Sequence, residues 1–309
     1  MSLRMRLLAG AMRPLVRSVN ARAQDPALLR RYLNRSARLF FRDVHFALYL
    51  PVTYLAAQGK LRRALWVSAQ ARPEPGKVLL YLHGGGYLAG SPHTHKRMVA
   101  RLCELSGLRA FLPAYALAPE HPVPAQLMDA EAAHAHLLSI GYAPDDIVLG
   151  GDSAGGGMAL ALLARLCQRD QAPAAVFAWS PFCDQTFSGG SVRENAKRDH
   201  FFPGDRVQEL ARMILGDTPA DDPRASPLFA DFPGCPPVFL QVADTEILRD
   251  DAVRMAEKLR GAGAEVSLDI WPDAPHVWQI FDGWFPEARQ AIGQTAGFIR
   301  RHLPSSGDS

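Results

Sequence analysis

The sequence predicts an α/β fold in which a mostly parallel central sheet is flanked by helices on both faces. The chain has 309 residues, of which 48% are hydrophobic, so it can bury a large core and its length fits one large α/β domain. From Lys77 onward, strand-like apolar runs alternate with helix-like stretches. This alternation is typical of parallel sheets, because each crossover between parallel strands is usually a helix.

The expected elements follow one another along the chain. Apolar, strand-forming runs occur at 77–82, 109–115, 146–151, 175–180, 237–243 and 265–271. Helices are expected between them, at about 94–106, 125–140, 154–168, 251–262 and 284–302. Open α/β sheets bind their ligands beyond the carboxyl ends of the strands, so the functional residues are expected in the loops at that edge.

Two segments fall outside this alternation. Residues 1 to about 50 have helical character without a strand partner, and 183–230 form a long insertion between two strands. Connections of this length are usually lids or binding elements. We therefore expect an α/β domain made of 51–182 and 231–309, covered at its carboxyl edge by a helical cap that combines the N-terminal segment 1–50 with the insertion 183–230.

Positive charge is concentrated near the N-terminus. The formal net charge is only +3, but residues 1–65 contain 13 arginines and lysines against two aspartates. Arg13 and Pro14 interrupt the first apolar run before it reaches signal-peptide length, and no apolar run approaches the roughly 20 residues of a membrane span. A basic helix at the N-terminus could contact an anionic membrane surface, although a solvated basic face packed on its own domain is the ordinary alternative.

The four cysteines lie far apart and contain no C-x-x-C pair. Such spacing gives neither a disulfide framework nor a metal site, and it predicts buried, reduced thiols in a cytoplasmic protein. We expect no metal, no cofactor and no nucleic-acid partner. The sequence leaves the oligomeric state open, and a homodimer is one possibility.

A candidate nucleophile lies between a predicted strand and a predicted helix. The stretch Gly151-Asp152-Ser153-Ala154-Gly155 is a G-x-S-x-G pattern in which the strand must turn sharply into the helix. Small residues two before and two after the serine are required there, because a side chain would collide with neighbouring backbone. The pattern predicts that Ser153 is exposed at the helix N-terminus as a nucleophile.

A serine nucleophile needs a general base, which follows it in the chain in folds with this turn. Only His200, His276 and His302 follow Ser153. His200 lies within the insertion and His302 ends the last helix, whereas His276 is in the loop after the final strand, at the same sheet edge as Ser153. We therefore predict His276 as the base.

The acid that orients the base should also follow a strand. Asp244 directly follows the strand 237–243 and is our prediction. Asp250 and Asp251 come later, at the start of a helix, where carboxylates more often cap the helix. Asp273 is close to His276 in sequence and is the second choice.

Three consecutive glycines follow the strand 77–82 in the run His83-Gly84-Gly85-Gly86. Glycines allow close approach of the main chain, and ester attack creates an oxyanion that backbone N–H groups can bind. We predict an oxyanion hole made by the N–H groups of Gly84, Gly85 and Ala154.

The same glycines also match the dinucleotide-binding pattern G-x-G-x-x-A. That function requires a helix beginning on the glycines, which Gly90-Ser91-Pro92 disfavours. His83 is expected to support the loop through hydrogen bonds, together with Tyr115, rather than to transfer protons.

These motifs together resemble the hormone-sensitive-lipase-type branch of the α/β-hydrolase superfamily, the bacterial family IV carboxylesterases. The resemblance extends from about residue 77 to the C-terminus and is carried by HGGGYLAGSPHTH at 83–95, YALAPEHPVPA at 115–125, GDSAGGGMA at 151–159, ADTEILRDDA at 243–252 and PHVW at 275–278. It implies an α/β-hydrolase fold, a triad of Ser153, Asp244 and His276, the oxyanion hole described above, a helical cap and no cofactor.

The resemblance implies a serine carboxylesterase that hydrolyses short- to medium-chain acyl esters through an acyl-enzyme intermediate. Thr245 and the alanines beside Tyr115 depart from the family pattern, which puts local rigidity in doubt rather than the chemistry. A membrane-surface lipase and a non-catalytic small-molecule binder on the same fold remain alternatives, and amidase or peptidase activity is less favoured.

Overall fold

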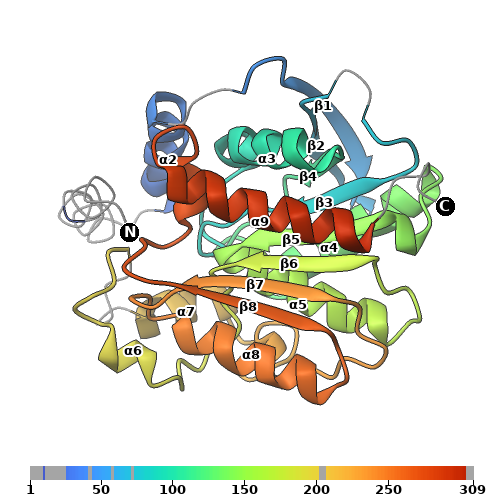
Figure 1. Ribbon diagram of the computed structural model, residues 1–309. Helices are drawn as coiled ribbons and strands as arrows, with labels where there is room; N and C mark the ends of the chain where they lie inside the picture. The colour runs from blue at the N-terminus through green and yellow to red at the C-terminus, as the bar shows by residue number, and fades with distance from the viewer. Residues whose placement is uncertain are drawn as a thin grey trace.

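One eight-stranded sheet forms the centre of the protein (Figure 1). The computed structural model describes residues 10, 26–40, 44–56, 59–70, 73–201 and 207–303. The strand order is β1-β2-β4-β3-β5-β6-β7-β8; β1 and β2 pair antiparallel, β2 pairs antiparallel with β4, and all other neighbours are parallel. The strands are β1 (Leu48–Leu55), β2 (Leu61–Ser68), β3 (Val78–Leu82), β4 (Arg109–Pro113), β5 (Ile147–Asp152), β6 (Ala175–Trp179), β7 (Val238–Ala243) and β8 (Val266–Trp271).

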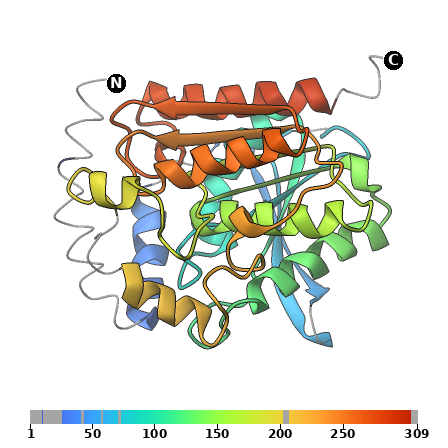
Figure 2. The same cartoon turned by 90° about the horizontal axis from the view of Figure 1, so that it is seen from below.

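Helices cover both faces of this sheet, as Figure 2 shows from below. Buried side chains of α3 and α9 form a core with one face, and those of α4, α5 and α8 form a larger core with the other. The helices are α2 (Pro26–Phe40), α3 (Pro92–Ser106), α4 (Ala125–Ser139), α5 (Ser153–Cys167), α6 (Ser191–Glu194), α7 (Val207–Leu215), α8 (Arg249–Gly261) and α9 (Pro286–His302).

The central strands are continuous apolar runs because both of their faces are covered. Every residue of β3, β5, β6 and β7 is buried. Parallel strands between two helical layers cannot alternate polar and apolar residues without burying polar side chains. The sequence prediction of an α/β fold with a mostly parallel, helix-flanked sheet is therefore confirmed, and each of the six predicted strands is present.

The hairpin of β1 and β2 was not predicted. It adds two antiparallel strands at one edge of the sheet, and β1 begins at Leu48, inside the segment that we expected to be helical. Its outer strand, LYLPVTYL, is apolar in sequence but contains Pro51, is mostly exposed with only Tyr54 buried, and precedes the strand–helix alternation on which the prediction relied. The proposed boundary at residue 50 therefore falls within a strand.

The N-terminal helix α2 packs beside α3, at the edge of the molecule. Arg30 of α2 donates hydrogen bonds to the carbonyl oxygens of Leu88 and Ala118, both at 2.8 Å, and pairs with Glu120. The predicted membrane contact of the basic N-terminus concerns in large part residues 1–9 and 11–25, which lie outside the described residues. Within the described part of the chain, no helix has the length and apolar character of a membrane span.

All four cysteines are free thiols. Cys103, Cys167 and Cys183 are buried, as expected, but Cys235 is only partly buried.

Candidate active site

Ser153 lies at the sharp turn between β5 and α5, near the centre of the sheet. Its φ angle is +52°, a left-handed conformation that is rare for residues other than glycine. A Cβ atom on Gly151 would lie 2.5 Å from the carbonyl oxygen of Leu82, and one on Gly155 would lie 2.1 Å from the same oxygen. The two glycines are therefore needed because α5 approaches the end of β3 so closely, which is the steric requirement of a nucleophile elbow.

His276 follows β8 and reaches the serine across the sheet edge. Its Nε2 atom is 2.9 Å from Ser153 Oγ, and both side chains are buried. His200 and His302 do not take this place; His302 Nε2 pairs instead with Glu265 at the end of α9. The structure thus brings together the nucleophile and the base that the sequence singled out.

The acid on His276 is Glu246, and the prediction of Asp244 is wrong. Glu246 Oε2 lies 2.5 Å from His276 Nδ1. Its other oxygen accepts hydrogen bonds from the Ser180 hydroxyl at 2.8 Å and from the Ala243 N–H at 2.7 Å. The carboxylate is 1% exposed and has a partner on each oxygen, so its position relative to the ring is fixed from two sides.

Asp244 points away from the ring and joins two loops. It accepts a hydrogen bond from the N–H of Asp273 at 2.7 Å, and its other oxygen is 3.4 Å from Arg198. Asp273, our second choice, is likewise only partly buried and lies 4.0 Å from Arg198. Neither carboxylate contacts His276 among the described contacts.

Asp250 and Asp251 are in the first turn of α8, where we expected caps. Their carboxylates bind another segment instead. Asp250 accepts a hydrogen bond from the N–H of Ser191, and Asp251 accepts two, from the N–H groups of Cys183 and Asp184. They therefore attach the insertion to α8.

The charges around His276 favour its protonated form. Burial lowers the pKa of the imidazole, but the negative charge and hydrogen bond of Glu246 outweigh it, and Asp199 and Asp152 contribute in the same direction. The net effect raises the pKa above 6.5. A base that gains a proton from Ser153 is thus stabilised in the state that it reaches during the reaction.

The glycine run lies beside the elbow, but its first N–H is already bound. Gly84 N–H donates to Asp152 Oδ1 at 3.0 Å, so the prediction that it faces an oxyanion is wrong. A Cβ atom on Gly84 would lie 2.1 Å from Asp152 Oδ2, and one on Gly85 would lie 2.2 Å from the carbonyl oxygen of Ala89. Gly86, with φ of +62°, faces open space.

A buried ion pair between Asp152 and His95 holds the glycine loop in place. Asp152 accepts hydrogen bonds from the Tyr81 hydroxyl at 2.6 Å and from Gly84, and its second oxygen is 3.3 Å from His95 Nε2. Burial raises the pKa of Asp152, but the charge of His95 and the hydrogen bonds from His95 and Tyr81 together outweigh it, so the net pKa is lowered. The residue beside the nucleophile therefore holds the glycine loop as a buried carboxylate.

His83 and Tyr115 lie in the same loop region. The Tyr115 hydroxyl donates to the carbonyl oxygen of His83 at 2.5 Å, and the two rings stack at 4.2 Å. Burial and the neighbouring His95 lower the pKa of His83 to about 3. A neutral, stacked ring suits a supporting role better than proton transfer.

Glu246 is the functional residue that sequence reasoning missed. Position alone favoured the first carboxylate after β7, but the backbone turns at Asp244 and Thr245, and Thr245 donates to the carbonyl oxygen of Ala274. The longer glutamate side chain then reaches back to the N–H of Ala243 and to His276. The only signal for it in the sequence was a second acidic residue after β7, separated from Asp244 by one residue. No group of three or more potential metal ligands occurs within the described ranges.

Known proteins with similar sequences are hydrolases. Residues 79–280 match a family model described as alpha/beta hydrolase fold. An acetyl-hydrolase of Streptomyces hygroscopicus is 36% identical over 230 residues, covering 74% of this chain and 76% of the relative. An esterase of Acinetobacter venetianus is 32% identical over 275 residues, covering 88% of each chain.

Solved structures give the same assignment. The crystal structure of an esterase from the bacterial hormone-sensitive lipase family is similar, with a TM-score of 0.86 and 35% identity over 96% of this chain and 98% of that chain. A mutant of esterase E40 has a TM-score of 0.89 and 34% identity over 98% of this chain. The chain belongs to the alpha/beta hydrolase fold family and, within it, to the hormone-sensitive-lipase group of esterases, and it is a carboxylic ester hydrolase.

Proposed function

We propose that this chain hydrolyses short- to medium-chain acyl esters through a covalent intermediate on Ser153, with His276 as the base and Glu246 as the acid. The observation that carries the proposal is a continuous hydrogen-bonded series: Ser153 Oγ to His276 Nε2 at 2.9 Å, and His276 Nδ1 to Glu246 Oε2 at 2.5 Å. A serine hydroxyl is a weak nucleophile unless such a base accepts its proton.

In the first half of the reaction, Ser153 Oγ attacks the ester carbonyl carbon and its proton passes to His276 Nε2. The tetrahedral intermediate then collapses, the bond to the alcohol oxygen breaks, and His276 returns the proton to the departing alkoxide. Glu246 accepts the Nδ1–H throughout, which leaves Nε2 as the acceptor before attack and stabilises the imidazolium after it.

In the second half, water takes the place of the alcohol. His276 accepts one proton of the water as its oxygen attacks the acyl carbon, and the second tetrahedral intermediate collapses with return of the proton to Ser153 Oγ. The carboxylic acid leaves and the enzyme regains its starting state. The two halves together consume one ester and one water molecule and release one alcohol and one carboxylic acid.

The oxyanion hole is assigned to the N–H groups of Gly85, Gly86 and Ala154. Gly86 takes the role that we first predicted for Gly84, because the N–H of Gly84 already donates to Asp152. Ala154 is in the first turn of α5, where the N–H groups have no acceptor within the helix. Each such donor typically contributes about 3–4 kcal/mol to transition-state binding.

The N-terminal segment and the insertion 183–230 are proposed to form a cap that positions the acyl chain. Arg30 of α2 anchors to the carbonyl oxygens of Leu88 and Ala118, close to the glycine loop. The ring of Phe201, in the insertion, has its centre 5.4 Å from that of His276. Both segments thus approach the catalytic groups from outside the sheet.

A chain-length series of chromogenic esters, from acetyl to dodecanoyl, tests this function. The intact enzyme is expected to turn over the shorter esters fastest, and Ser153→Ala is expected to turn over none above about one ten-thousandth of the wild-type kcat. Greater activity on dispersed long-chain lipid than on any soluble ester would instead favour a membrane-surface lipase. Activity retained by Ser153→Ala would contradict the serine mechanism.

A further inference from the structure

The loop that carries Glu246 is held from the side of the insertion by a buried asparagine. Asn195 follows α6, and its Nδ2 donates to the carbonyl oxygens of Asp244 and Glu246, each at 2.8 Å. Asn195 is 1% exposed. One amide group therefore fixes the peptide unit between Asp244 and Thr245 and the peptide unit between Glu246 and Ile247.

A buried carboxylate binds the other side of the peptide unit that joins Glu246 to Ile247. Asp199 Oδ2 accepts a hydrogen bond from the N–H of Ile247 at 2.8 Å, and Oδ1 accepts one from the N–H of Phe201 at 2.7 Å. Asp199 is 2% exposed. Because the ring of Phe201 lies beside His276, Asp199 connects the backbone on one side of the acid to an aromatic side chain next to the base.

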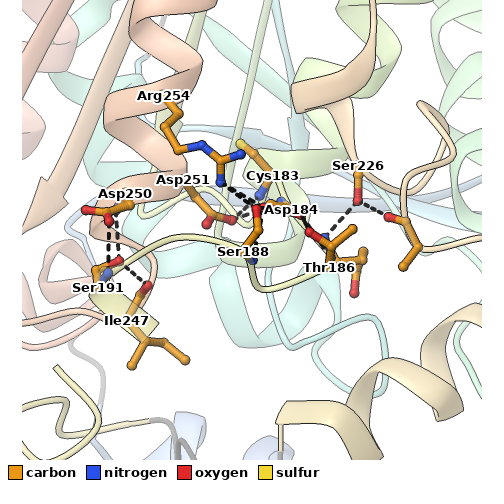
Figure 3. Close-up of polar contacts among 12 residues, drawn as sticks. Cys183, Asp184, Thr186, Ser188, Ser191, Ser226, Ile247, Asp250, Asp251 and Arg254 are labelled. Carbon is orange, nitrogen blue, oxygen red and sulfur yellow. Dashed lines mark hydrogen bonds and ion pairs between the residues drawn. The ribbon is translucent and has the colours of Figure 1, made fainter. Parts of the chain in front are cut away.

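Ser191 completes the attachment at the start of α6. Its hydroxyl donates to the carbonyl oxygen of Ile247 at 2.6 Å and accepts from the N–H of Asp250 at 3.1 Å, while its own N–H donates to the Asp250 carboxylate (Figure 3). The segment 191–199 thus contributes three buried polar side chains to the acid loop 244–250. A surface lid that only excludes solvent would not need buried hydrogen bonds to this loop.

We propose that Asn195 and Asp199 are positioning residues that hold the acid loop so that Glu246 meets His276, and that the charge of Asp199 helps to stabilise the His276 imidazolium. The inference rests on the proposed serine mechanism and deepens it. It assigns to the insertion a part in assembling the triad, in addition to covering the substrate.

The charges that face His276 come from three different elements. They are Glu246 from the acid loop, Asp199 from the insertion and Asp152 from the end of β5. In the part of the chain that the structure describes, Glu246 and His276 are titratable groups that act on Asp199; burial, followed by Glu246, raises the pKa of Asp199, and His276 opposes the shift. The two N–H donors on Asp199 favour its ionised form, which is the form that acts on His276.

The first test replaces the charge and keeps the shape. In Asp199→Asn, the apparent pKa of kcat/KM is expected to fall by about one unit, the lower end of the shifts that neighbouring charges cause. The direction follows because removal of a negative charge destabilises the imidazolium, so His276 becomes neutral at a lower pH. Asp199→Glu retains the charge and is expected to keep the wild-type midpoint.

The second test removes the amide donors. In Asn195→Ser, kcat is expected to fall between about tenfold and a hundredfold with little change in KM, as for a catalytic group displaced on the 1 Å scale. The matched control is Glu194→Gln, which removes an exposed ion pair between α6 and Arg249 of α8 without touching residues 244–247. It is expected to keep the wild-type kcat and pH midpoint.

Titration with a serine-directed phosphonate gives the concentration of active sites in each preparation, so that kcat is calculated per folded enzyme. The pH midpoint is independent of how much of the enzyme is folded. The inference is overturned if Asp199→Asn keeps the wild-type midpoint, or if Asn195→Ser matches Glu194→Gln in kcat. Failure of the serine mechanism itself is separate, because it would appear as activity or phosphonate labelling that survives Ser153→Ala.

Discussion

Replacement of Glu246 by glutamine is a sharp perturbation of the triad, because it keeps the side-chain shape and removes the charge. In the native site, Oε1 accepts from Ser180 and from the N–H of Ala243, and Oε2 faces His276 Nδ1. All of these partners except the histidine require an acceptor on the first oxygen. A glutamine amide can supply only one oxygen, so it must choose between the two sides.

If the amide oxygen stays with Ala243, the NH₂ group faces His276 Nδ1. The ring must then accept at Nδ1 and carry its proton on Nε2, where it cannot take the Ser153 proton. If the amide is reversed, the NH₂ group faces the buried N–H of Ala243 and both donors are unsatisfied. The reversed amide costs about 1–3 kcal/mol. The His276 tautomer that can accept the Ser153 proton is therefore only a minor population.

The reversed amide alone lowers kcat by about 5-fold to 150-fold, at 1.36 kcal/mol per factor of ten. Loss of the negative charge beside the imidazolium adds to this. Together the expected loss in kcat for Glu246→Gln is on the order of 10³–10⁴, as for an acid-to-amide change in a serine triad.

Asp244→Asn is the matched control, two residues away. Asn can still accept from the N–H of Asp273, and the ion pair lost with Arg198 is long and exposed. Its expected loss is less than about fivefold, since exposed ion pairs contribute little. The assay is kcat on a short-chain ester at a pH where His276 is neutral, with circular dichroism to verify the fold. A larger loss in Asp244→Asn than in Glu246→Gln would refute the reasoning.

Three further predictions follow from the site and the core. The kcat/KM of the wild type should rise with pH through an apparent pKa above 6.5 and then level off, because His276 must be neutral to act as the base and its pKa is raised. The measurement is a pH series with and without a chelator; a midpoint below 6.5, or loss of activity with the chelator, would contradict this. Gly155→Ala should lower the free energy of unfolding by about 1–3 kcal/mol, since the new Cβ would lie 2.1 Å from a backbone oxygen. Gly293→Ala in α9 meets no atom within 4 Å and should raise the free energy of unfolding by up to about 1 kcal/mol, so equal melting temperatures of the two variants would disprove the elbow packing. Asp152→Asn should lower kcat by about tenfold to a hundredfold through displacement of the glycine loop, and wild-type kinetics of this variant would show that its bond to Gly84 is dispensable.

The sequence was sufficient for the fold and for the pairing of Ser153 with His276 because those features have strict steric or periodic causes. The buried strands are continuous apolar runs, and the elbow needs glycine at 151 and 155 because the end of β3 approaches it closely. His276 was found by its place after the last strand, since the carboxyl ends of parallel strands meet at one edge.

The acid could not be chosen from order alone. Asp244 and Glu246 both follow β7, and the choice depends on a turn in which Thr245 binds Ala274 and Asp244 binds the N–H of Asp273. Those partners are about 30 positions away in the chain. The burial of Glu246 and the exposure of Asp244 are consequences of that long-range packing, which no local pattern encodes.

The glycine loop shows the same limit. The three glycines indicated a close approach of the backbone, but the N–H of Gly84 binds Asp152 of the protein itself rather than a ligand. Gly84 is close to Asp152, a residue whose burial depends on Tyr81 and His95. The β1–β2 hairpin was missed for a different reason: it precedes the alternation that begins at Lys77, and its outer strand, although apolar in sequence, is an exposed edge strand that contains Pro51.

The most direct test of the central claim is the mass of the enzyme after reaction with a serine-directed phosphonate, followed by peptide mapping and by the rate of labelling in variants. A single phosphonyl group is expected on Ser153, formed rapidly in the wild type and in Asp244→Asn, much more slowly in Glu246→Gln, and not at all in Ser153→Ala. Labelling at another residue, or equal rates in Glu246→Gln and the wild type, would contradict a triad of Ser153, His276 and Glu246.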